Sequence, residues 1–159
     1  MKKLHNFLLL LIIYSSSFYS FAINIDGLLN ESVWENAQEF DDFLTVFPNN
    51  QSKPKYKTNV KYFSTSEGIY FGITNSQPIS EQTLQQHSRD YFYADVDRVV
   101  LMIDFEGKGN VGYEFTVSLG DSLRDAIVIN ENEISQNWDS IWFAKTHQNS
   151  NEWFAEYFI

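Results

Sequence analysis

The chain has 159 residues, no cysteine and an acidic balance, with 21 acidic residues against 11 basic ones. A surface this acidic repels phosphate backbones and anionic lipid headgroups, which argues against nucleic acid and peripheral membrane partners. Because no disulfide can form, stability has to come from a buried core, and aromatic residues, at 17% of the chain, can supply it.

Residues 1–22 are predicted to be a signal peptide. Lys2 and Lys3 precede an apolar run over residues 7–13, and Ser20 and Ala22 are small residues before the expected cleavage point. The apolar run is shorter than the ~20 residues that span a bilayer. We therefore expect an exported protein, periplasmic, outer membrane-associated or extracellular. Cleavage leaves 137 of 159 residues, with nine basic and 21 acidic residues and a net charge of −12.

The mature chain is predicted to begin with one short helical turn and then to change to strands. Asn30 can cap a turn that directs Trp34 inward. Residues 40–47 form the first extended run. Residues 56–63 and 69–74 flank a Ser-Glu-Gly turn and are expected to pair as a hairpin.

The second half is predicted to contain a long functional loop followed by short strands. Residues 75–94 are polar, with a possible helical turn over 80–87. Residues 98–104 are almost continuously apolar, which predicts a central strand and a core position for Met102. Further strands are expected over 112–119, 123–129, 138–146 and 152–159.

Short strands joined by Gly, Asn and Asp turns predict an all-β fold, an antiparallel β-sandwich of jelly-roll-like form. Residues 23–159 would be one domain. The chain ends within a strand pattern at Ile159. We therefore expect this domain to be incomplete at its C-terminus and to lack its last strands.

Several spaced features together resemble the carbohydrate-binding module family 9 type of domain. They are Ile25-Asp26-Gly27 with Trp34, Thr58-Asn59-Val60, Asp97-Arg98-Val99, Tyr113 to Val117, Arg124-Asp125-Ala126, Trp138-Asp139 with Trp142, and Trp153-Phe154-Ala155-Glu156. The closest likeness is to copies that follow the signal peptide of outer-membrane β-barrel proteins. The resemblance implies a β-sandwich, a polysaccharide or oligosaccharide ligand, and a C-terminal β-barrel in a longer parent protein.

Two tryptophans are the candidates for stacking on sugar rings. Trp138 follows a polar stretch, and Trp142 would share its sheet face roughly 13 Å away if both lie on one strand. Asp121, Arg124 and Asp125 would bond sugar hydroxyls. Packing of the two indoles and an edge salt bridge among the charged residues are the alternatives. Trp34 and Trp153 are expected in the core.

A calcium site is a second hypothesis, and no other cofactor is expected. Asp90, Asp95 and Asp97 lie close in sequence and could share an ion, which loop carbonyls would help to coordinate. In the family that this chain resembles, calcium supports the structure of some members. The alternative is that these carboxylates pair with Arg89 and Arg98.

Catalysis is not expected. His87 and His147 have no nucleophile motif beside them, and no two carboxylates are set at a glycosidase separation by the sequence. The leading hypothesis is an exported, non-catalytic carbohydrate-binding module at the cell envelope. The alternatives are a structural accessory domain of an outer-membrane β-barrel protein without a sugar site, and a haem-binding sandwich domain that uses Met102.

Overall fold

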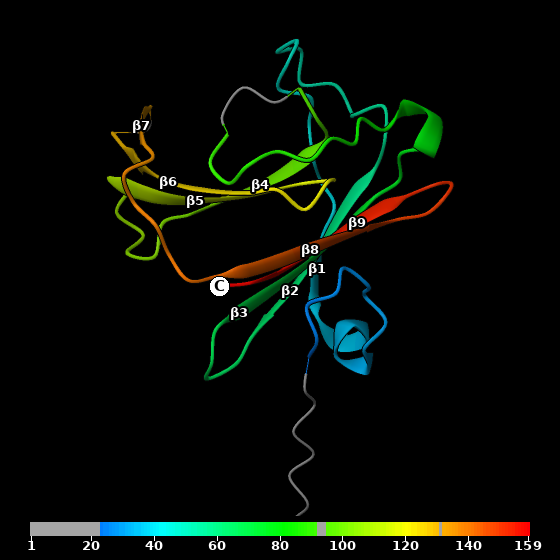
Figure 1. Cartoon of the computed structure of the whole chain (residues 1–159), viewed down its shortest axis with the longest axis horizontal. Coiled ribbons are helices and arrows are strands. Elements are labelled where there is room, and N and C mark those ends of the chain that lie inside the picture. Colours follow the sequence, from blue (N-terminus) through cyan, green and yellow to red (C-terminus); the bar gives the residue numbers. More distant parts are fainter. Residues whose placement is uncertain (1–22, 92–94, 131) are drawn as a thin grey trace, which may run out of the picture.

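The computed structural model describes residues 23–91, 95–130 and 132–159, and it confirms the predicted all-β antiparallel sandwich. Two sheets lie one above the other (Figure 1). The five-stranded sheet has the order β1 (Gln38–Phe40), β2 (Thr58–Ser64), β3 (Ile69–Asn75), β9 (Trp153–Phe158), β8 (Phe143–Gln148). The four-stranded sheet has the order β4 (Arg98–Ile103), β5 (Val111–Ser118), β6 (Leu123–Ile129), β7 (Glu133–Ser135). The signal peptide predicted for residues 1–22 lies outside the described residues.

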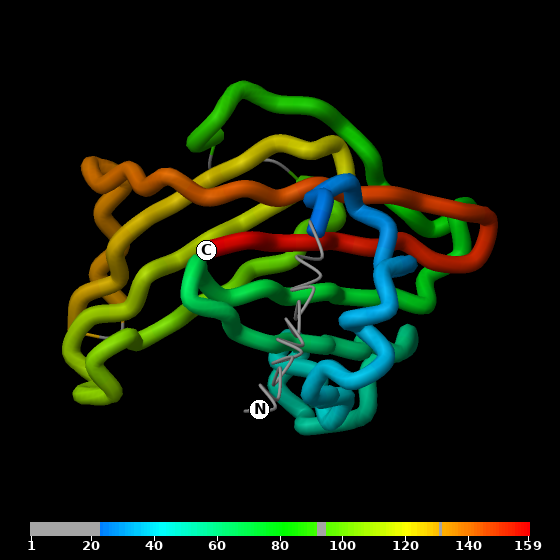
Figure 2. Tube along the Cα trace, turned by 90° about the horizontal axis from the view of Figure 1, so that it is seen from below, coloured from blue at the N-terminus to red at the C-terminus, as the bar shows by residue number. Residues whose placement is uncertain are grey.

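Local pairing follows the sequence pattern closely in the hairpins. β2 and β3 pair from Thr58 opposite Asn75 to Ser64 opposite Ile69, as the alternation and the intervening turn predict. The last strand, β9, lies between β3 and β8, as the red trace in Figure 2 shows. Ile159 exchanges two backbone hydrogen bonds with Ile69, of 2.8 and 3.0 Å. That the domain lacks further strands stays a prediction.

The space between the sheets is filled mainly by rings. Its buried members are Ile73, Phe115, Val117, Leu119, Trp142, Ala144, Trp153, Ala155 and Tyr157. The Tyr157 hydroxyl joins the two layers: it donates to the Val99 carbonyl at 2.9 Å and accepts from the Val117 amide at 3.2 Å. Burial raises the pKa of Tyr157 well above its ordinary value, so the neutral hydroxyl remains a donor.

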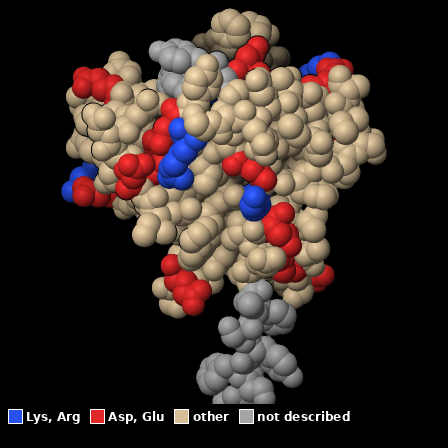
Figure 3. Space-filling model, in the orientation of Figure 1, with Lys and Arg blue, Asp and Glu red and all other residues tan. Residues whose placement is uncertain are grey.

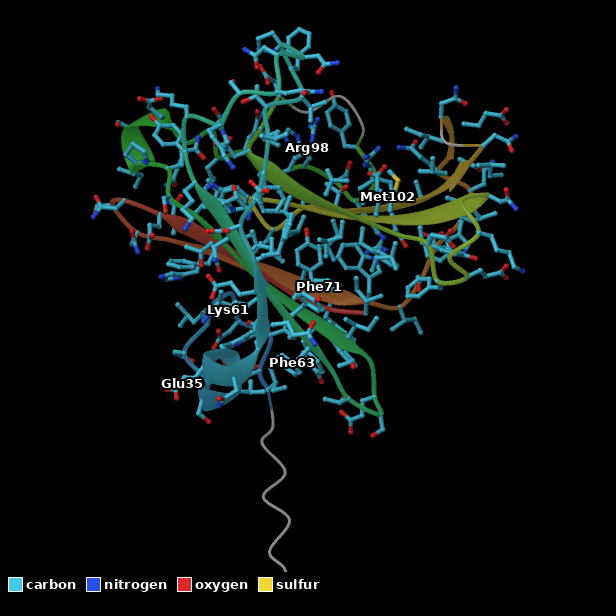
Figure 4. The ribbon with its side chains drawn as sticks, turned by 180° about the vertical axis from the view of Figure 1, so that it is seen from behind. Glu35, Lys61, Phe63, Phe71, Arg98 and Met102 are labelled. Carbon is cyan, nitrogen blue, oxygen red and sulfur yellow. The ribbon has the colours of Figure 1, made fainter. Side chains whose placement is uncertain are left out.

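The segment that follows the predicted leader packs on the outer face of the five-stranded sheet. A 3-10 turn over Ser32–Asn36 buries Trp34, whose ring meets Phe63 edge-on at 5.0 Å. Figure 4 shows Phe63 and Lys61 on this layer, and the Lys61 ammonium donates to the Trp34 carbonyl. The residue that precedes the turn is Glu31, with no side-chain cap, so the predicted capping by Asn30 is wrong.

Four other expectations about elements are corrected. Of the run 40–47, only Phe40 belongs to a strand, because residues 41–57 form a loop in which Thr45 bonds to Ser52. The helical turn expected over 80–87 is a single turn at Ile79–Glu81. β4 is an edge strand, not a central one, and Met102 on it is 57% exposed. β7 was not expected. Among the described residues, no helix has the length and apolarity needed to cross a bilayer.

Candidate functional site

The polar loop between η2 (Ile79–Glu81) and β4 is held against the beginning of β6. The His87 amide donates to the Ser122 hydroxyl at 2.7 Å, and that hydroxyl donates back to the His87 carbonyl at 3.0 Å. The Asp90 amide donates to the Leu123 carbonyl at 3.0 Å. β7 pairs only with the second half of β6, so this loop occupies the edge of the first half. The loop thereby contributes side chains to two sites: Arg89 and Asp90 to the first, and His87, Ser88 and Tyr91 to the second.

The first site is a group of charged residues that we call the β6-edge cluster: Arg89, Asp90, Asp125 and Asp139. Their carboxylates, one oxygen from each, lie within 4.8 Å of one another. The Arg89 guanidinium is 2.6 Å from buried Asp125, 3.7 Å from Asp90 and 3.9 Å from Asp139. The second oxygen of Asp125 accepts the Ser140 amide at 2.7 Å. Three separate segments therefore converge on one arginine.

Trp142 borders this cluster, with the Arg89 guanidinium carbon 5.9 Å from its ring centre, and Trp138 directly precedes Asp139 in the chain. Of the two, only Trp138 is partly exposed. Trp138 is partly exposed, with its ring 4.9 Å from Tyr113 and 5.9 Å from Phe115. Trp142 is 4% exposed, meets Phe115 edge-on at 5.4 Å and lies over Tyr157 at 5.8 Å. The prediction that Trp142 stacks on sugar is therefore corrected, because core rings cover its faces.

The expected separation of the two indoles along one strand is also wrong. Both residues precede β8, which begins at Phe143, so the period of a strand does not govern them. Their rings instead pack around the same core residue, Phe115. Trp34 and Trp153 are buried, as predicted.

The residues proposed for calcium do not come together as a set. Asp90 joins Asp125 and Asp139, whereas the Asp97 carboxylate accepts the Thr83 amide and the Gln77 side chain, and Asp95 is exposed. Calcium needs six to eight oxygen ligands. In the β6-edge cluster a guanidinium already supplies the positive charge among the carboxylates. The arrangement therefore fits an arginine-centred network and does not fit a calcium site.

The second site is a concavity that we call the outer-face hollow. It lies on the outer side of β4, β5 and β6, beneath His87 and Tyr91, and has a volume of about 100 Å³. Arg124 lines it and pairs with the buried carboxylate of Glu114, which also accepts the Thr116 hydroxyl at 2.8 Å. The residues that line the hollow are His87, Ser88, Tyr91, Val96, Arg98, Thr116, Ser118, Ser122, Leu123 and Arg124.

Sequence reasoning identified Arg124 but not the hollow. His87 and Tyr91 lie in a polar loop without periodicity, so nothing local indicated that their rings stack at 5.2 Å. The alternation of β5 did place Thr116 and Ser118 on one face. The covering of that face by a loop depends on long-range bonds such as that between His87 and Ser122.

Asp121 lies apart from both sites and has a structural role. One of its oxygens accepts the Thr146 amide at 2.7 Å and the Thr146 hydroxyl at 2.8 Å, and the other is 3.1 Å from the Lys145 ammonium. It thus fastens the β5–β6 turn to the edge strand β8.

We expect Asp121→Ala to lower the free energy of unfolding by about 1–3 kcal/mol, because the Thr146 amide loses its acceptor. Asp121→Asn is the matched variant: it keeps an acceptor oxygen and tolerates the positive φ of 61°. Urea unfolding of both variants measures the difference. A loss of glycan binding in a folded Asp121→Ala protein would instead return this residue to the sugar site.

Comparisons of the chain with protein-family models, with curated proteins and with solved structures find no match. The fold and the side-chain geometry are therefore the basis for a functional proposal.

Proposed function

We propose that this domain is a non-catalytic carbohydrate-binding module that acts outside the cytoplasm. The observation that supports it is a partly exposed indole, Trp138, that directly precedes Asp139, an exposed member of the β6-edge cluster. Sugar rings present apolar C–H faces and hydroxyls that both donate and accept. An indole beside carboxylate acceptors and a guanidinium donor complements both.

The core fixes the orientation of this indole. Tyr113 and Phe115 pack against Trp138 from the interior, so little side-chain entropy remains to be lost on binding. Asp139 follows directly in the chain and is exposed, and Arg89 is 40% exposed. Both can therefore exchange bonds to water for bonds to ligand hydroxyls, at a small net gain for each bond. Weak, reversible recognition is the expected behaviour.

Tryptophan fluorescence provides a selective test. The chain has four tryptophans, and Trp34, Trp142 and Trp153 are all buried. A saturable spectral change on titration with a soluble glycan panel is therefore expected to come from Trp138. Trp138→Ala is expected to abolish the change and weaken binding by about tenfold or more in calorimetry.

The matched control is Phe47→Ala, which removes an aromatic ring that is 94% exposed on a different loop. It is expected to bind like the unaltered protein. Absence of binding to every glycan, from a sample with a cooperative melt, would contradict the proposal. Equal affinity of Trp138→Ala and the unaltered protein would contradict this placement of the site.

A further inference from the structure

We propose that the outer-face hollow binds an oxyanion, a carboxylate or a sulfate ester, that is carried by a saccharide. The inference rests on the proposed function for the class of ligand, but not on stacking by Trp138. It would make the domain selective for acidic saccharides over neutral ones.

The composition of the hollow is the first argument. The chain carries 21 acidic residues, yet the ten described residues that line this concavity include no Asp, Glu or Lys. Two of the three arginines of the chain line it, with a histidine, a tyrosine and four serine or threonine side chains. Arginine presents a planar fork of donors that matches carboxylate and sulfate oxygens. The hydroxyls of Ser88 and Ser118 can add donors, whereas those of Thr116 and Ser122 already donate to Glu114 and to the His87 carbonyl.

The arrangement of these donors follows from strand register. Arg98 on β4 lies opposite Ser118 on β5, and Thr116 on β5 lies opposite Arg124 on β6, so the floor carries donors across three strands. Figure 4 shows Arg98 at one end of β4 and Met102 near the other. Ser88 adds a hydroxyl from the loop that covers this face. The donors therefore converge from separate elements and do not form a single surface stripe.

The roof adds a group whose bonding is incomplete. His87 lines the hollow, and its Nε2 is buried and bonds to no described residue. Burying such a nitrogen without a partner is costly, and an oxyanion could accept a hydrogen bond from an N–H at this position. Tyr91 stacks on His87 with an interplanar angle of 16° and is 51% exposed. Its outward part can contact the sugar ring that carries the oxyanion.

The volume sets the size of the group. At about 100 Å³ the hollow has room for several waters. This space suits a carboxylate or a sulfate group, and we expect the pyranose ring that carries it to lie at the opening, near Tyr91. The overall negative charge of the domain opposes anions at long range, but that repulsion is screened beyond about 10 Å at 0.1 M salt.

Calorimetric titration of the secreted chain at 0.1 M salt tests the inference with three probes. The first is a galacturonate oligosaccharide and the second is its fully methyl-esterified form, which is neutral. The third is an oligosaccharide of neutral sugars that carries anionic sulfate esters. We expect at least one of the two anionic probes to bind about tenfold or more tighter than the ester, since a charge-assisted bond is lost in the ester. Arg98→Gln is expected to remove this preference.

Controls separate charge from structure. Lys108→Gln removes a positive charge from an exposed turn, where Lys108 pairs with Glu106, and it is expected to keep the preference. Arg98→Lys is expected to retain only part of it, because an ammonium lacks the planar fork. For Arg124, the double change Arg124→Gln with Glu114→Gln avoids leaving a buried carboxylate unpaired.

The outcomes distinguish this inference from the proposed function. Equal binding of acidic and neutral probes overturns the oxyanion site and leaves the carbohydrate-binding function standing. Absence of binding to all three overturns the inference, and the glycan panel then decides the function independently. Binding of free acetate or inorganic sulfate as tight as that of the anionic oligosaccharides overturns the saccharide part. A preference that persists in Trp138→Ala supports the hollow as a separate site.

Discussion

Replacing Trp142 with alanine is expected to lower the free energy of unfolding by about 3–5 kcal/mol, the usual cost of removing a buried aromatic ring. The indole is 4% exposed and lies between Phe115 on the four-stranded sheet and Tyr157 on the five-stranded sheet. Its removal would leave a cavity where the two layers meet. The Arg89 guanidinium carbon, 5.9 Å from the indole ring centre, would also lose its cation–π partner.

Chemical denaturation at constant pH measures this effect, and Trp138→Ala is the matched comparison. Trp138 is partly exposed, so the same truncation is expected to cost clearly less stability while it removes the glycan response. Trp142→Phe keeps an aromatic ring in the core and is expected to recover part of the loss. A cost for Trp142→Ala no larger than that for Trp138→Ala would contradict the assignment of Trp142 to the core.

The bounds of a strand were predictable from sequence where turn residues flank an extended run. β2, β3 and β6 lie within two residues of their expected bounds, and each follows or precedes such a turn. β4 was placed wrongly within its sheet although its residues alternate between exposed and partly buried. Val100 and Met102 are apolar but face outward and are exposed, so an edge strand reads as a continuous apolar run. No local signal separates this case from a central strand.

The sequence predicted only part of the site. The part that it missed depends on contacts between residues far apart in the chain, as does the place of β4 in its sheet. The sequence identified Trp138, Asp125 and Asp90 individually. Their convergence depends on Arg89, which bridges residues 36 and 50 positions away in the chain. Asp90 was grouped with Asp95 and Asp97 because short sequence distance was the only available guide. In the structure Asp97 instead holds the Thr83 amide of its own loop. The residues next to a charged side chain in the sequence do not indicate which distant residues it pairs with in the fold.

Most of the described basic side chains pair with acidic ones while acidic side chains remain in excess, which limits what can be inferred from net charge alone. On the face shown in Figure 3 the Lys and Arg side chains lie against Asp or Glu. The described pairs include Lys53 with Asp42, Lys57 with Asp41 and Lys55 with Glu81. Such exposed pairs add little stability and are screened by salt. The outer-face hollow differs from this surface, because the described residues that line it include two arginines and no acidic residue.

The stability of the domain is expected to fall by about 3 kcal/mol as the pH rises from 4.5 to about 7, because of Glu156. This carboxyl is fully buried, and one oxygen accepts the Asp26 and Gly27 amides at 3.0 and 3.1 Å. The pKa of Glu156 is raised from 4.5 to about 7, mainly by burial and to a smaller extent by the nearby Glu31 and Asp26 carboxylates, against the opposing effect of the two amide hydrogen bonds.

The direction follows from proton binding. Between these two pKa values the folded state holds a proton that the unfolded state has released, so each rise in pH favours unfolding. The stabilising contribution is complete below about 4.5 and absent above about 7. Urea denaturation across this interval measures it. Other carboxyls whose pKa is lowered, such as Asp41 and Asp104, act in the opposite direction and only at lower pH.

Glu156→Gln isolates the contribution of this one carboxyl. The amide oxygen can still accept from the Asp26 and Gly27 amides, but the side chain no longer titrates, so stability is expected to become nearly independent of pH over the same interval. Glu106→Gln, in the exposed turn after β4, is the control and is expected to keep the full dependence. If Glu156→Gln kept it as well, the proton would belong to another group. The attachment of the segment containing Gly27 to the sheet would then be insensitive to the ionisation of Glu156.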